Sequence, residues 1–87
     1  MPDLGNPISY LVLEEGAAVY ASDGEQVGEV AEISADMVND LFEGIVVRHH
    51  ILGHRHFVDA EQIDELCERG VKLALGSDAI EALPEPD

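Results

Sequence analysis

The chain has 87 residues, of which 19 are acidic and four are Lys or Arg, so its formal net charge is −15. This length allows one domain, residues 1–87, with a thin aliphatic core, since there is no Trp and there are only two Tyr and two Phe. A strongly negative surface repels phosphate backbones and anionic lipids, so we expect no nucleic-acid partner and no membrane insertion. With only one lysine, the charge also suggests adaptation to high salt, where screening relieves self-repulsion.

The only cysteine is Cys67, so the chain has no intrachain disulfide. Residues 1–4, Met-Pro-Asp-Leu, lack the basic stretch of a secretion signal, and we expect a cytoplasmic protein. Glu65 and Glu68 lie close to Cys67 in the sequence and disfavour its thiolate, so the cysteine is interpreted as an unreactive buried residue that occupies space in the interior.

The first residues predict an extended segment after a loose start. Residues 1–7 are polar and carry two prolines, which indicates a loose arm. Residues 8–13, ISYLVL, favour a strand, either in the fold or pairing outside it. The apolar run within it makes this segment a candidate surface for another protein chain, by strand addition or hydrophobic contact. Its residues are Tyr10, Leu11, Val12 and Leu13.

The clearest local signal is a β-hairpin over residues 17–34. Asp23-Gly24 lies between apolar runs and predicts a tight turn joining strands at 17–21 and 26–34. Gly28, inside the second strand, indicates a bend or a close backbone approach, as at the corner of a small barrel.

Further short strands are predicted in the second half. After a polar connection at 35–40, strands are expected at 41–49 and 54–59. Residues 60–67 fit either a helix or a short turn leading into a strand. Residues 71–75 alternate as a strand.

A short helix is predicted near the C-terminus, with Ser77 as its N-cap and Pro84 ending it. Ile80 and Leu83 share one face of this helix, which must dock on the sheet or on a second copy of the chain. Residues 84–87 are expected to be a frayed acidic tail.

Several short motifs in residues 16–76 follow one another in an order that is also found in a known protein family. They are Val19-Tyr20, Asp23-Gly24, Val27-Gly28-x-Val30, Gly44-Ile45-Val46-Val47, Arg55-His56-Phe57-Val58-Asp59-Ala60 and Gly70-Val71-Lys72-Leu73. Together they resemble PRC-barrel domains, although the Val-Pro frequent in that family is Val58-Asp59 here.

This resemblance implies an all-β fold, a small and strongly bent PRC-type β-barrel, here with a short C-terminal helix. Family members include a domain of the photosynthetic reaction-centre H subunit, a domain of a ribosome-maturation factor and stand-alone proteins. They mostly bind other proteins and share no catalytic residues, so none is carried over. The matching positions Gly24, Gly28 and Val30 are structural in the family.

Four histidines lie within eight positions on one predicted hairpin. With a two-residue loop at Leu52-Gly53, His49 faces His56, and His54 lies on the same side; a three-residue loop puts His50 opposite His54. Three imidazoles on one face, His49, His54 and His56, could hold zinc or another divalent transition metal. They could also respond to pH, or simply be a solvated hairpin end.

Catalytic motifs are not evident. The acidic residues form no convincing acid–base pair, no serine lies in a nucleophile motif, and no glycine-rich loop precedes a helix. We therefore expect no enzymatic activity and no organic cofactor.

The leading hypothesis is a non-catalytic protein-binding or scaffold module that self-associates, as a homodimer, through residues Tyr10 to Leu13 with Ile80 and Leu83. The alternative is a metal- or pH-responsive module using the histidine hairpin. A small-molecule hydrolase is the least supported, because a thin core leaves little room for a deep pocket.

Overall fold

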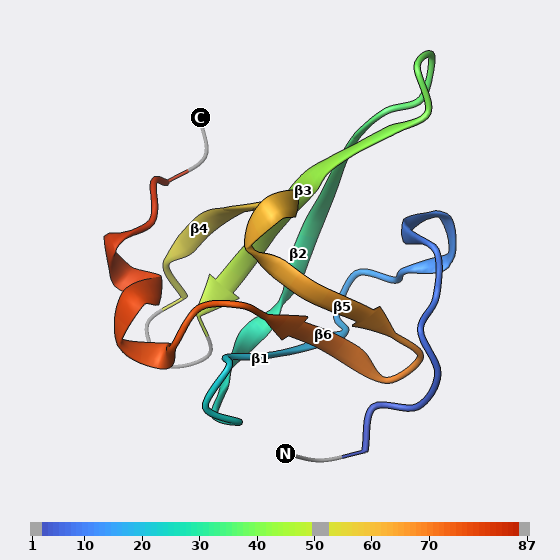
Figure 1. Cartoon of the computed structure of the whole chain (residues 1–87). Coiled ribbons are helices and arrows are strands. Elements are labelled where there is room, and N and C mark those ends of the chain that lie inside the picture. The colour runs from blue at the N-terminus through green and yellow to red at the C-terminus, as the bar shows by residue number, and fades with distance from the viewer. Residues whose placement is uncertain (1–2, 50–52, 86–87) are drawn as a thin grey trace.

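The computed structural model describes residues 3–49 and 53–85. Its strands form one mixed sheet with the order β4-β3-β2-β1-β6-β5 (Figure 1). Neighbouring strands are antiparallel except for β1 and β6, which pair in parallel. The bounds are Ala18–Tyr20 for β1, Gln26–Asp36 for β2, Leu41–His49 for β3, Arg55–Asp59 for β4, Ile63–Cys67 for β5 and Gly70–Leu73 for β6.

The sheet is not closed into a barrel. In the described residues β4 and β5 lie at opposite edges and form no ladder with each other. The β-rich fold is thus confirmed, whereas the expected closed barrel is not formed. Each edge is covered locally instead: the Phe57 amide of β4 donates to the Pro84 carbonyl, and the Ile8 amide donates to the Leu66 carbonyl of β5.

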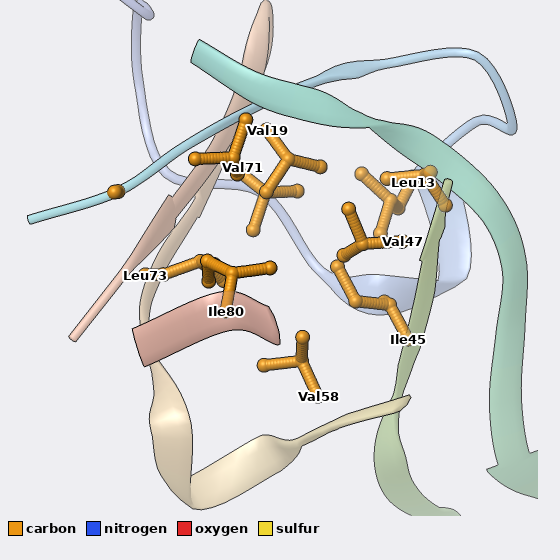
Figure 2. Close-up of a cluster of buried hydrophobic side chains, with 11 residues drawn as sticks. Leu13, Val19, Ile45, Val47, Val58, Val71, Leu73 and Ile80 are labelled. Atoms are coloured by element: carbon orange, nitrogen blue, oxygen red, sulfur yellow. The ribbon is translucent and has the colours of Figure 1, made fainter. Parts of the chain in front are cut away.

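Side chains from both halves of the sheet meet in one aliphatic core, as the composition predicted. Figure 2 shows Ile80 pointing into this cluster beside Leu73 and Val58. All three are inaccessible or nearly so. The buried cluster consists of Leu13, Val19, Ala21, Val27, Val30, Ile45, Val47, Val58, Val71, Leu73 and Ile80.

The hairpin predicted at Asp23-Gly24 is confirmed. The Gly24 amide donates to the Ala21 carbonyl at 2.9 Å, and the Ala21 amide donates to Glu25 at 2.8 Å. Gly24 has a φ of 90°, a left-handed conformation that glycine adopts without a steric cost. The second strand of this hairpin, β2, runs two residues beyond its predicted end, to Asp36.

Three short 3₁₀ helices complete the fold: η1 (Tyr10–Val12), η2 (Ala60–Gln62) and η3 (Ser77–Ala82). The strand expected over residues 8–13 is wrong, because the Ser9 hydroxyl accepts from the Leu11 amide and caps η1. At η2, Asp59 forms a capping box with Gln62, and β5 follows at once. Of the two readings of residues 60–67, the turn leading into a strand is therefore correct.

The C-terminal helix is a 3₁₀ turn, and its predicted cap is wrong. The N-cap position of η3 is Gly76, which makes no side-chain cap bond. Ser77 instead donates from its hydroxyl to the Asp23 carboxylate at 2.7 Å. This bond ties the start of η3 to the β1–β2 turn, while Ile80 anchors η3 in the core.

The N-terminal arm is attached to the sheet in its described part, contrary to the loose arm expected for residues 1–7. Leu4 is buried, and its carbonyl accepts from the Arg69 amide at 2.9 Å. The Asn6 carbonyl accepts from Glu68, and Pro7 forms an isolated bridge with Cys67. The N-terminal segment thereby runs along the β5–β6 turn (Figure 1). Residues 1, 2, 86 and 87 of the expected loose ends lie outside the described residues.

Candidate functional site

The outer half of the β2–β3 hairpin projects from the rest of the sheet (Figure 1). Along β2, pairing with β1 extends only to Glu29, and β4 pairs with β3 only as far as Gly44. In residues 31–43, called the arm below, β2 therefore has β3 as its only partner strand: residues 32–34 pair with residues 44–46, and Ala35 and Asp36 pair with Phe42 and Leu41. A two-stranded ribbon of this kind leaves backbone donors and acceptors available along both sides.

The tip of the arm exposes apolar side chains. The Asp36 carboxylate accepts from the Val38 and Asn39 amides and from the Asn39 side chain, which closes the turn. These bonds, that of the Asn39 side chain foremost, lower the pKa of Asp36. With the backbone held this way, Met37 and Val38 point to solvent with 68% and 93% of their surface exposed. Leu41, the first residue of β3, is 57% exposed.

Helix η1 packs against this arm. The Tyr10 ring stacks on Phe42 with 5.2 Å between centroids, and the Tyr10 hydroxyl donates to Asp40 at 2.5 Å. That hydrogen bond is the main reason why the pKa of Tyr10 is raised. Beyond these contacts, Leu11 and Val12 are 60% and 62% exposed. The five most exposed large apolar residues described thus belong to η1 and the arm.

The predicted contact residues divide into two groups. Leu11 and Val12 are exposed as a contact surface requires, and Tyr10 is half-buried against Phe42. Leu13 and Ile80 are core residues, so they are not available to a partner. Leu83 is half-buried and packs against the core, and its carbonyl faces the His56 ring.

The sequence pattern does not point to Met37, Val38 and Leu41 as contact residues, because it predicts a polar connection at residues 35–40. A signal was present: two apolar side chains between Asp36 and Asn39-Asp40 have no place in a core when they lie at a hairpin turn. Recognising it required knowing that β2 and β3 pair directly.

At the end of the β2–β3 hairpin away from the tip, a row of charged residues crosses three neighbouring strands. Glu29 of β2 is the register partner of Arg48 of β3, which is in turn the partner of Arg55 of β4. Glu29 and Arg48 form an ion pair in which both side chains are partly exposed. Arg55 is exposed and forms no ion pair with any described residue.

The histidine hairpin has neither of the predicted registers. The His49 amide donates to the His54 carbonyl at 2.7 Å, and His56 is the register partner of Val47. His54 is exposed, whereas His56 is buried and its Nδ1 lies 3.1 Å from the Leu83 carbonyl, which fastens the end of η3 to β4. The position of His50 lies outside the described residues.

The described ranges 3–49 and 53–85 contain no group of three His, Cys, Asp or Glu side chains able to hold a metal ion. His49, His54 and His56 are therefore not gathered into the metal site that the alternative hypothesis required. The backbone register explains this, because it turns His56 into the interior and leaves His54 at the rim.

Two surface hollows lie beside the candidate surface. One, of about 480 Å³, lies between η1 and the β5–β6 turn and is lined by Val12, Glu14, Glu68 and Arg69 among others. The second, of about 580 Å³, lies at the base of the arm. Cys67 borders the first hollow; burial and the bond that its thiol donates to Glu65 raise its pKa to about 11, so the thiol is protonated near neutrality.

Within the described residues, no helix is both long enough and apolar enough to cross a membrane. The sequence matches no protein-family model and no curated protein.

Proposed function

We propose that the chain is a non-catalytic protein-binding module that associates with further copies of itself through the arm and η1. The observation that carries this proposal is the exposure of Met37, Val38 and Leu41 at the end of a projecting hairpin. Contiguous apolar side chains on a projection are typical of an interaction surface, since a free monomer would normally cover or avoid them.

The chemistry of the surface supports binding more than turnover. Its apolar residues are held by hydrogen bonds at Asp36 and Asp40 and by the Tyr10–Phe42 stack. These contacts pre-organise the tip, and its Asp36 and Asp40 carboxylates are engaged in them as hydrogen-bond acceptors. A rigid apolar tip loses little conformational freedom when it docks.

The chain is also proposed to be a divergent relative of the PRC-barrel proteins. Support comes from the Asp23-Gly24 turn and from Gly28, whose position tolerates no side chain. The two halves of the open sheet enclose one core, as the walls of a strongly bent barrel would.

Sedimentation velocity over a wide concentration range tests the binding proposal. Wild-type protein should form species larger than a monomer, and Val38→Ser should weaken the association about tenfold because it removes a well-exposed apolar contact. Leu11→Ser serves as the companion variant and reports whether η1 belongs to the same surface.

Circular dichroism should show both variants to be folded, since neither side chain lies in the core. A wild-type protein that stays monomeric at every concentration, in dilute buffer and in molar salt alike, would exclude self-association.

A further inference from the structure

The two ends of the β2–β3 hairpin carry opposite charges. Residues 31–43 contain Glu32, Asp36, Asp40 and Glu43 and no base. At the far end of β3, Arg48 and Arg55 face each other across β3 and β4. About 23 Å of extended strand separates Leu41, the register partner of Asp36, from Arg48, so the acids at the tip, Asp36 and Asp40, cannot reach the arginines within one molecule.

Arg55 is the cation left over after the ion pairs of the described residues are formed. Of the four Lys and Arg in the chain, Arg48 pairs with Glu29, Arg69 with Asp3 and Lys72 with Asp64. Arg55 lies directly opposite Arg48, and the Glu29 carboxylate that pairs with Arg48 lies one strand further away, so Arg55 keeps a like charge as its cross-strand neighbour and is repelled by it. A carboxylate brought to Arg55 from outside would relieve that repulsion.

The tip of the arm carries the carboxylates that Arg55 lacks as partners. Val38 is exposed between Asp36 and Asp40, so a docked tip would bring an apolar contact and negative charge to the same place. A tip-to-tip dimer would instead bring the acids of two arms together, at a cost in repulsion.

We propose that the arm tip of one copy docks on the Arg48–Arg55 end of the next copy. This contact is head-to-tail: each molecule uses a different surface on each side, so the assembly can extend beyond a dimer unless it closes into a ring. The inference rests on the proposed self-association and names the two surfaces that meet.

Two variants and their mixture test the contact by sedimentation velocity at one fixed ionic strength. Val38→Asp disables the tip but leaves the arginines, and Arg55→Glu disables the basic end but leaves the tip. Both positions are exposed, and Arg55→Glu places an opposite charge across from Arg48, so both variants should fold. Arg69→Glu is the control for the change of charge itself: it reverses the same charge at the β5–β6 turn, where it also removes the exposed ion pair with Asp3.

Each variant alone should associate at least about tenfold more weakly than wild type, while Arg69→Glu should follow wild type. An equimolar mixture of Val38→Asp and Arg55→Glu should form a one-to-one dimer and nothing larger, because one intact tip and one intact basic end remain. A tip-to-tip interface cannot produce this recovery.

Self-association and the head-to-tail contact are contradicted by different results. If wild type is monomeric throughout, self-association itself is excluded. If wild type associates but Arg55→Glu behaves like Arg69→Glu, or the mixture stays monomeric, the head-to-tail contact is wrong and self-association stands.

Discussion

Gly28 lies where the backbone of β2 comes close to the backbone of β3. A Cβ at this position would lie 2.1 Å from the Arg48 carbonyl oxygen and 3.1 Å from a methyl carbon of Val47. The sequence offered a bend or a close approach as reasons for this glycine. The structure supports the close approach, because the demand is for space and the φ of Gly28 is not in the left-handed region.

Gly28→Ala should lower the free energy of unfolding by at least about 2 kcal/mol, since the backbone of β3 must shift to make room. Denaturant unfolding measures this loss. Gly53→Ala is the control: its Cβ meets no atom within 4 Å, but its φ of 72° is unfavourable for alanine, so a loss of about 1 kcal/mol is expected. A Gly28→Ala protein more stable than the control would contradict the steric account.

Helix η1 shows why the character of a short element is decided by its neighbours. Residues 8–13 have high β propensity, yet the Ser9 cap and the Tyr10 contacts with Phe42 and Asp40 make the segment a 3₁₀ turn. β propensity is weak against such local hydrogen bonds. The same contacts brace the arm.

Asp40→Asn should lower the pKa of Tyr10 towards its ordinary value. The neutral hydroxyl is the donor to Asp40, so the folded state holds the Tyr10 proton more tightly than the unfolded chain does. The corresponding stabilisation is complete below the unfolded pKa and is lost as pH rises through the raised, folded value.

Phenolate absorbance during an alkaline titration measures this pKa, in a Tyr20→Phe background so that only Tyr10 contributes. An unchanged titration after Asp40→Asn would show that the hydrogen bond does not persist in solution.

The charge of the whole molecule opposes its compact state. The chain has nineteen acids and four bases, and among the described residues three of those bases have carboxylate partners. The surplus is spread over an exposed surface, so its repulsion acts between many distant groups and is sensitive to ionic strength.

The midpoint of thermal unfolding should rise with salt, because between about 0.01 M and 1 M the screening length falls from about 30 Å to about 3 Å. Relief of about 1 kcal/mol would raise the midpoint by about 4–8 °C for a domain of this size. Calorimetry on the wild type and on Glu14→Gln/Glu15→Gln checks it, since the variant with fewer exposed acids should respond less. Equal midpoints at both salt concentrations would disprove the idea.

Local signals predicted the parts of the fold that depend on a few neighbouring residues. Asp23-Gly24 specified a turn, because its backbone conformation is available to glycine at no cost. The composition likewise predicted an aliphatic core. The histidine register was missed, because neither a two- nor a three-residue loop matches the pairing of Val47 with His56.

The sequence alone determined a β-rich chain, an acidic surface and a hairpin at Asp23-Gly24, because these depend on composition and on short-range backbone geometry. Only the tertiary structure decided which apolar residues are exposed. Leu13 and Ile80 enter the core while Val38 remains in solvent. Burial depends on which strands pair and where they stop, and β1 and β4 stop before the arm does. That early end of the neighbouring strands creates the projecting tip on which the proposed function depends.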